Sequence, residues 1–225
     1  MSNALKVVAG VAVVVVVAGA VWFFAIRSDA PPAVTATECP DAAAAPSDAP
    51  SGTWTVVAGD PSFVGYRMEE VFGGGSVFDQ VAVGQTTALT GELVLDDGDI
   101  DTVTVTADVT QLESDKARRD NFLKSEALQT ETFGEATFTL TEPITIDPAS
   151  GCVNTEASGQ LTLHGQMLPV VVPVSATWDG EAIEVTGSAP IVLADYAIEP
   201  ANVAGLVTVA DDGVMEFTVR FAPPA

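Results

Sequence analysis

In the stretch Val214–Ala222, VMEFTVRFA, residues 215–221 alternate strictly between large apolar side chains and polar or charged ones. Side chains of an extended strand point alternately to the two faces of a sheet. The stretch therefore predicts a strand with one buried apolar face and one outward polar face. The apolar face carries Met215, Phe217, Val219 and Phe221, and the polar face carries Glu216, Thr218 and Arg220.

The same period of two continues outward from this strand over residues 52–225, in runs rich in Val, Thr, Ile and Phe. Asp-Gly pairs at 97–98, 179–180 and 212–213 are predicted to lie between strands, because tight hairpins favour them. Only Ser114–Gln129 breaks the rhythm, and it predicts a helix with Ser114 or Asp115 as its N-cap. We expect one all-β domain of about eight to ten antiparallel strands, either a barrel or a sandwich. The inserted helix favours a barrel whose mouth it covers.

An uninterrupted apolar run, VVAGVAVVVVVAGAVWFFAI, occupies residues 7–26 between Lys6 and Arg27. Twenty helical residues span about 30 Å, the thickness of the hydrocarbon core of a bilayer. A cleavable signal peptide is the alternative, but the run continues well past the small residues at 18–20. We therefore interpret residues 1–27 as a single transmembrane helix that anchors the protein in the cell membrane. The weak charge bias places the domain on the extracytoplasmic side.

Residues 28–51 are rich in Pro, Ala, Ser and Asp and show no periodicity, so they are interpreted as an extracytoplasmic linker. Cys39 lies in this linker, and Cys152 lies in the β-rich domain. Outside the membrane the compartment is usually oxidising, so the two cysteines are a candidate disulfide that would pin the linker to the domain. Two separate thiols, or thiols paired between molecules, are the alternative.

The composition excludes several classes of function. Eight Lys and Arg stand against 31 Asp and Glu, a formal net charge of −23, which argues against nucleic acid as a partner. Two cysteines and one histidine are too few for a zinc finger or a Cys/His metal cluster. His164 is predicted to be exposed at a turn, and no nucleophile motif accompanies it, so we expect no metal, no cofactor and no catalytic residue. Four of the domain's basic residues share the predicted helix, as a solvated face or as a positive patch beside a cavity mouth: Lys116, Arg118, Arg119 and Lys124.

Several motifs together resemble the YceI-like family of lipid-binding proteins. GQLTLHGQMLPVV at 159–171 resembles the family's signature strand pair, and DPSFVGY at 60–66 resembles its opening strand. RRDNFLKS at 118–125 and Asp195-Tyr196-Ala197-Ile198 follow in the family's order. The residues at 166–168 depart from the family pattern and leave the ligand's head group open.

The resemblance implies a lipocalin-like antiparallel barrel of about eight strands, without catalysis, that holds a polyisoprenoid, an isoprenoid quinone or a fatty amide chain. The expected function is therefore a membrane-tethered carrier of a hydrophobic lipid ligand; a cell-envelope module whose barrel is filled by its own side chains is the alternative. A hydrolase using His164 is a weaker third hypothesis. By alternation, the residues expected to line the cavity are Tyr66, Met68, Phe122, Leu123, Phe138 and Tyr196.

Overall fold

The computed structural model describes residues 30–36, 39, 50–72, 78–96, 98–147, 150–203 and 207–223. The predicted anchor, residues 1–27, and most of the predicted linker lie outside these ranges. None of the helices in the part that is described has the length and apolar character needed to cross a bilayer.

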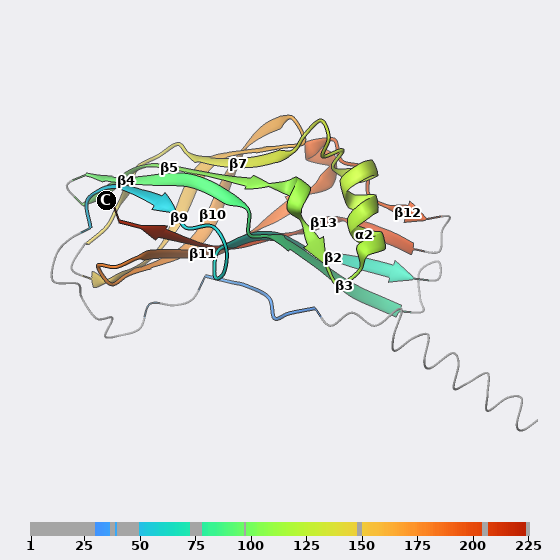
Figure 1. The fold of residues 1–225 in the computed structure, drawn as a ribbon, viewed down its shortest axis with the longest axis horizontal. Coiled ribbons are helices and arrows are strands. Elements are labelled where there is room, and N and C mark those ends of the chain that lie inside the picture. Colours follow the sequence, from blue (N-terminus) through green and yellow to red (C-terminus); the bar gives the residue numbers. More distant parts are fainter. Residues whose placement is uncertain are drawn as a thin grey trace, which may run out of the picture.

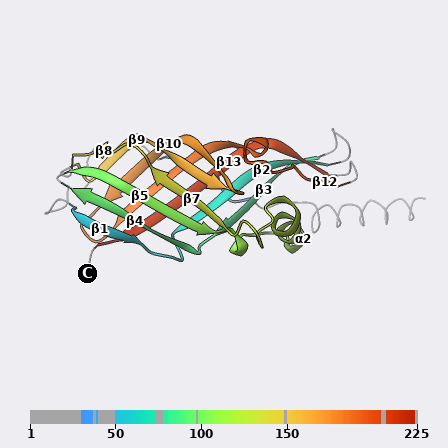
Figure 2. The same ribbon diagram turned by 90° about the horizontal axis from the view of Figure 1, so that it is seen from above.

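Eight antiparallel strands close into a barrel, which confirms the all-β fold and decides between barrel and sandwich. Figures 1 and 2 show this barrel from two directions. Around the ring the strands are β1 (Gly52–Val56), β4 (Leu89–Asp96), β5 (Asp99–Asp108), β7 (Glu135–Leu140), β9 (Cys152–Leu163), β10 (Gln166–Trp178), β11 (Ile183–Val192) and β13 (Val207–Ala222). The ring closes because the end of β13 pairs back with β1 at Thr55 and Val56.

β13 is long enough to close the barrel and also to pair with strands that extend the same sheet beyond it. Its last residues pair with β1, while Val207–Val209 and Gly213–Thr218 pair with β2 (Phe63–Phe72). β2 in turn pairs with β3 (Phe78–Thr86), and β3 pairs with β6 (Glu113–Ser114). Two short strands, β8 (Ile144–Thr145) and β12 (Asn202–Val203), pair with β5 and β13. In both views this extension and the inserted helix lie at the end of the barrel away from the C-terminus (Figures 1 and 2).

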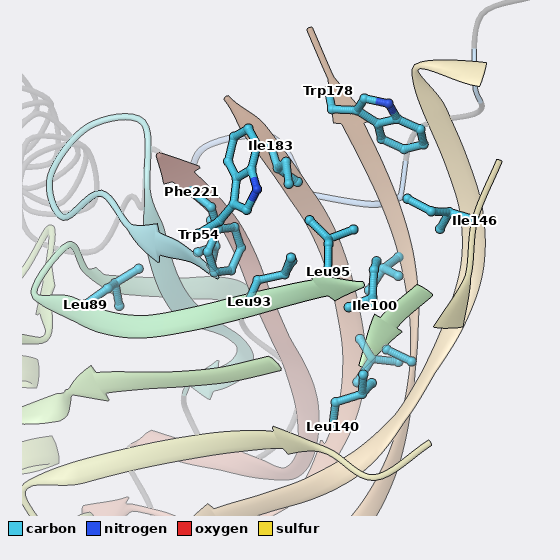
Figure 3. Packing of buried hydrophobic residues seen from close by; sticks show 14 of the residues in the cluster. Trp54, Leu89, Leu93, Leu95, Ile100, Leu140, Ile146, Trp178, Ile183 and Phe221 are labelled. Carbon is cyan, nitrogen blue, oxygen red and sulfur yellow. The ribbon is translucent and has the colours of Figure 1, made fainter. Parts of the chain in front are cut away.

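The interior is built by the alternation that the sequence predicts. Met215, Phe217, Val219 and Phe221 of β13 all point into the barrel, where they line a cavity. Trp54 of β1 and Leu93 of β4 gather with Phe221 at the end away from the helix (Figure 3). This buried cluster is the main core of the domain.

The glycines of two of the three predicted Asp-Gly turns lie between strands; Asp97 itself lies outside the described residues. Gly98 stands in the β4–β5 hairpin with φ +90°, and Gly180 stands in the β10–β11 hairpin with φ +91°. The Asp179 carboxylate accepts hydrogen bonds from the backbone N–H groups of Glu181 and Ala182, and these bonds lower the pKa of Asp179.

The prediction for Asp212-Gly213 is wrong, because both residues lie inside β13 beside a bulge between Val209 and Gly213. A side chain at Gly213 would place its Cβ 1.9 Å from Met68 Sδ. The glycine therefore makes room for Met68 of the neighbouring strand and is not needed for a turn.

The predicted helix exists but is shorter and begins later. α2 spans Ala117–Phe122 and continues as a π-helical turn over Leu123–Ala127. Neither Ser114 nor Asp115 is its N-cap, because the chain is still extended at Ser114, which pairs with Gly84 of β3. Two 3₁₀ turns, at Val109–Gln111 and Leu193–Tyr196, complete the described helical segments.

Residues 30–36, named here the strap, run extended along the outside of the barrel. The backbone N–H of Val34 donates to Glu216 Oε1 (3.3 Å), and Arg67 Nη2 donates to the Pro31 carbonyl (2.8 Å). Arg67 Nε also donates to Glu216 Oε1 (2.6 Å). Glu216 faces outward from β13, as the alternation predicts, yet only 3% of its surface is exposed because the strap covers it.

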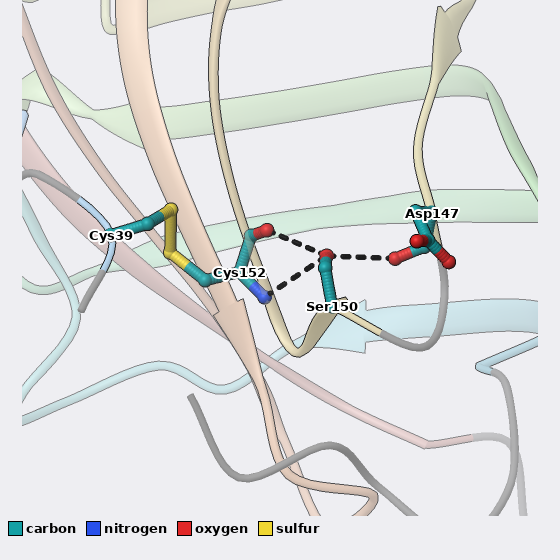
Figure 4. Close-up of a disulfide and its surroundings, with 4 residues drawn as sticks. All are labelled: Cys39, Asp147, Ser150 and Cys152. Carbon is teal, nitrogen blue, oxygen red and sulfur yellow. Dashed lines mark hydrogen bonds between the residues drawn. A yellow bond between two sulfur atoms is a disulfide. The ribbon is translucent and has the colours of Figure 1, made fainter. Parts of the chain in front are cut away.

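A disulfide joins Cys39, just beyond the strap, to Cys152 at the start of β9. The Ser150 hydroxyl oxygen braces this turn, 2.7 Å from the carbonyl oxygen of Cys152 and 2.8 Å from that of Asp147 (Figure 4). The linker is therefore tied covalently to the barrel.

Candidate ligand cavity

The barrel interior contains two cavities that differ in size and polarity. The inner cavity, about 110 Å³, lies among apolar side chains such as Leu93, Ile100 and Phe221, and Thr155 is the only polar one among the described residues that line it. The outer cavity, about 810 Å³, extends to α2 and the β2–β3 extension. Its walls are also mostly apolar, although several charged and polar side chains stand among them.

The two cavities meet within the barrel. Val64, Ala136, Leu161 and Met215, from four different strands, line both of them. The two cavities are therefore adjacent, and the outer one is the one that reaches α2. Such a shape fits an elongated apolar molecule with its end near α2.

One ion pair stands in the wall of the outer cavity. Arg119 of α2 donates from Nε to Glu70 Oε1 (2.8 Å) and from Nη2 to Glu70 Oε2 (2.9 Å). The two side chains are only 14% and 9% exposed, so each charge depends on the other. Burial would lower the pKa of Arg119, but the bonds and charges of Glu70 and Asp115 outweigh burial and raise it. This pair ties the helix to β2 across the mouth.

The Tyr66 side chain lies inside the outer cavity, two residues before Met68 and four before Glu70 on the same face of β2. Its ring crosses Gly84 of β3, where an added Cβ would come within 2.5 Å of Tyr66 Cε1. Its hydroxyl is buried and has no hydrogen-bond partner in the described part of the chain. Burial, the largest effect, raises the pKa of Tyr66, so the group stays a neutral O–H donor.

The residues predicted from the sequence fall into three places. Tyr66, Met68, Phe122 and Leu123 line the outer cavity, and Phe138 lines the inner one. Tyr196 lines neither. It is buried in a side cluster with Val109, Leu112, Leu128, Leu161 and Ile198, and burial raises its pKa.

His164 is not the exposed turn residue that the sequence predicts. It adopts a left-handed backbone conformation (φ +49°), but its side chain is only 8% exposed and lies edge-on to Phe133 at 4.5 Å between ring centroids. Nδ1 lies 3.0 Å from the Tyr196 carbonyl; because a carbonyl can only accept, Nδ1 carries the proton. Nε2 has no partner among the described residues. This histidine belongs to the packing that holds the 3₁₀ turn of Tyr196.

Sequence reasoning missed Glu70 as a member of the cavity wall. Of the four basic residues expected to form either a solvated face or a positive patch beside a cavity mouth, Lys116, Arg118 and Arg119 line the outer cavity and Lys124 does not. Alternation along FVGYRMEEV does place Glu70 on the face of Tyr66 and Met68, so the signal was present. A carboxylate is ordinarily expected to face solvent. Glu70 can face the cavity because Arg119, which is far from it in sequence, pairs with its charge.

Comparison with known proteins assigns most of the chain to one family. The family model described as the YceI-like domain matches residues 59–221. A UPF0312 protein of Vibrio cholerae is 29% identical over 133 residues, covering 55% of this chain and 68% of that protein. A UPF0312 protein of Vibrio parahaemolyticus is 29% identical over 124 residues, covering 51% and 64%.

Solved structures share the fold. A polyisoprenoid binding domain from Saccharophagus degradans superposes with a TM-score of 0.59 at 19% identity, covering 76% of this chain and 98% of that one. Burkholderia cenocepacia BcnA gives a TM-score of 0.52 at 20% identity, covering 71% and 95%. The YCEI protein of Campylobacter jejuni gives 0.52 at 18% identity, covering 63% and 85%.

Proposed function

This chain belongs to the YceI-like domain family, and from that premise we propose that it is a lipid carrier tethered to the outer face of the cell membrane. In this proposal the barrel holds one long apolar lipid, of the polyisoprenoid or isoprenoid quinone type, for transport, storage or sequestration. No catalytic step is part of it.

The observation that carries the proposal is the pair of adjacent, mostly apolar cavities in the barrel. The outer cavity measures about 810 Å³ and shares four lining residues with the inner one, and both are walled mainly by aliphatic and aromatic side chains. Binding of an apolar molecule in such a cavity lowers the free energy by about 25 cal/mol for each Å² of apolar surface removed from water. The alternative, an envelope module filled by its own side chains, does not account for the empty volume.

The ligand class comes from a relative. The similar structure from Saccharophagus degradans is described as a polyisoprenoid binding domain. An isoprenoid chain is long, flexible and wholly apolar, and it suits cavities with mostly apolar walls.

The membrane tether rests on the apolar run at residues 7–26 and on the direction of the strap. Val34 bonds to Glu216, which pairs with Gly65, while Pro31 bonds to Arg67, two residues further along β2. Toward its N-terminus the strap thus follows β2 in the direction of the α2 end (Figure 1). Only residues 27–29 separate the strap from the apolar run. A tether of that length would hold the open end of the barrel near the bilayer from which a lipid enters.

The proposal is tested on the full chain, purified from membranes and extracted with organic solvent. Ala136 lines both cavities, so Ala136→Phe places a ring where they meet. Thr139→Phe, on the exposed face of the same strand, is the matched control, because it adds the same ring outside the barrel. Both variants carry the same surrounding membrane lipid, so a difference between them reports on the cavity.

We expect one isoprenoid lipid per chain from the wild type and from Thr139→Phe. The amount of this lipid extracted per chain should be about tenfold lower for Ala136→Phe, which corresponds to ~1.4 kcal/mol of binding free energy. Equal recovery of that lipid from all three proteins, or from none of them, would count against the carrier.

A further inference from the structure

One stretch of the barrel wall has no backbone ladder. β10 pairs with β9 along almost its whole length, but it pairs with β11 only from Val174 to Trp178. β11 in turn pairs with β13 from its first residue to its last. Among the described residues, no ladder therefore joins residues 166–173 of β10 to residues 188–192 of β11, and we name this boundary the seam.

Three prolines keep the seam free of a ladder. The Pro173 carbonyl points toward β11, because a Cβ built at Gly187 of β11 would lie 2.7 Å from its oxygen. Backbone groups two residues apart in a strand point the same way, so Pro169 faces the same edge twice removed. By the register of the two strands, Pro190 points to the opposing edge of β11. Proline has no N–H to donate, so strands tolerate it where no neighbour needs a donor.

The surface beside the seam is apolar and uncharged. The two facing stretches, QMLPVVVP and SAPIV, contain no charged residue in a chain whose net charge is −23. Met167 and Val171 of β10 are 61% and 53% exposed, and Val192 of β11 is 38% exposed. Exposed apolar side chains that gather in one place are typical of a surface that contacts apolar molecules.

A short segment, residues 193–198, lies between the seam and the outer cavity, and we name it the plug. Tyr196 and Ile198 of the plug are buried in a cluster against which Leu168 of β10 packs. Leu193 and Ile198 also line the outer cavity. The plug is therefore part of the cavity wall at the seam.

Two hydrogen bonds fasten the plug, one on each side of the seam. His164 Nδ1, in the turn between β9 and β10, donates to the Tyr196 carbonyl (3.0 Å). On the other side, the backbone N–H of Ala194 donates to Asp211 Oδ1 of β13 (3.1 Å). A segment held by a few bonds and outside the strand ladders can open locally while the sheet around it stays folded.

We propose that the seam is a side entry to the outer cavity and that the plug is its gate, which moves aside while the apolar chain of a lipid passes between β10 and β11. The inference rests on the proposed carrier function and adds a route to it. Along this route the lipid chain meets Met167, Val171 and Val192 before it reaches the cavity, so it crosses an apolar surface.

The test measures how fast a probe enters and leaves the full chain in lipid nanodiscs. The probe is dansyl-labelled geranylgeraniol. Energy transfer from Trp54 and Trp178, which are buried in the barrel, reports the arrival of the probe there. All proteins carry Trp22→Phe, which removes the third tryptophan, in the predicted anchor.

Asp211→Ala removes the acceptor of the Ala194 bond. It should speed association and dissociation of the probe by the same factor, about two- to tenfold, the usual worth of one hydrogen bond. The dissociation constant should stay the same, because the plug is closed both with and without the probe. Asp212→Ala is the matched control: it removes the same charge from the next residue, whose side chain makes no hydrogen bond to the plug in the described part of the chain. Its rates should equal those of the parent.

The route is tested by photocrosslinking. p-Benzoylphenylalanine at Val171, beside the seam, should trap the probe on illumination. The same group at Val57, an exposed apolar residue that follows β1 and lies outside the seam, is the control and should trap much less.

The outcomes separate the two proposals. If the probe binds none of the proteins, the carrier function itself fails. If it binds, but Asp211→Ala and Asp212→Ala share the same rates, the carrier stands and the gate is overturned. Equal trapping at positions 171 and 57 would overturn the side entry. A changed dissociation constant with an unchanged association rate would show that the plug only lines the site, and it would overturn the gate as well.

Discussion

At the scale of single residues, two glycines create the space in which aromatic rings lie inside the barrel. Gly84 lies against the ring of Tyr66, and Gly159 of β9 lies against the ring of Phe138. A Cβ at Gly159 would stand 2.4 Å from Phe138 Cε2 and 2.6 Å from the Thr139 carbonyl oxygen. Because that oxygen belongs to a paired backbone, it cannot move aside as a flexible side chain would.

Gly159→Ala should therefore destabilise the barrel by about 1–3 kcal/mol, the usual cost of an overpacked interior. Urea denaturation followed by tryptophan fluorescence measures the change. Ser158→Ala, the preceding residue on the same strand, is the control, and it should change stability by no more than about 0.5 kcal/mol. Equal midpoints for the two variants would show that the sheet opens to accept the methyl group.

Single residues also mark what could be predicted from the sequence. Tyr66 and Met68 lie in a regular strand, where the alternation of side chains fixes their direction. Tyr196 and His164 lie in or beside turns, where no period applies, so neither the packing of Tyr196 away from the cavity nor the burial of His164 could be predicted.

At the scale of elements, the strap is held by hydrogen bonds along it and by a disulfide just beyond it. Hydrogen bonds from Val34 and to Pro31 fix it to β13 and β2, and the disulfide of Cys39 fixes it to β9. The cysteines are 113 residues apart in sequence, so the bond closes a long loop of the unfolded chain.

Replacing both cysteines, as Cys39→Ser with Cys152→Ser, should lower the free energy of unfolding by about 2–4 kcal/mol. Hydrogen exchange at the Val34 amide should quicken by a larger factor than at the amides of β9 and β10, because the strap loses its covalent end. Reducing the wild type with dithiothreitol should reproduce both effects. Unchanged protection of Val34 would mean that its bond to Glu216 holds the strap without the disulfide.

The sequence predicts which segments form strands better than it predicts the order in which those strands pair. Local alternation predicts β13 as a strand, but which strands pair with it depends on contacts between distant segments. Asp212-Gly213 illustrates this point: the pair is typical of a hairpin, and its place in mid-strand depends on Met68, almost 150 residues earlier in the chain. The late start of α2 has the same origin, because Ser114 is held extended by β3.

At the scale of the whole molecule, the excess of acidic residues is the dominant electrostatic feature. A net charge of −23 repels itself more strongly in the compact state than in the unfolded one. Raising the sodium chloride concentration from near zero to about 0.15 M shortens the screening length to about 8 Å and weakens that repulsion.

The melting temperature should therefore rise with salt, by about 2–4 °C for each kcal/mol of repulsion removed. Calorimetry across a salt series measures it, and potassium chloride in place of sodium chloride checks that the effect is not specific to one cation. A melting temperature that falls over this range would indicate that the ion pairs of Arg67 and Arg119 contribute more than the repulsion.

Closure of the barrel by β13 also sets an order of events during biosynthesis. A ribosome delivers the chain from its N-terminus, and β13 follows every strand with which it pairs: β1, β2, β11 and β12. Until residues 207–222 emerge, a nascent chain exposes β1 and β2 with edges that nothing in the same molecule covers. A chain that ends before Val207 because of a premature stop codon would thus be degraded by proteases or aggregate, and it would not form a closed barrel that can hold a ligand.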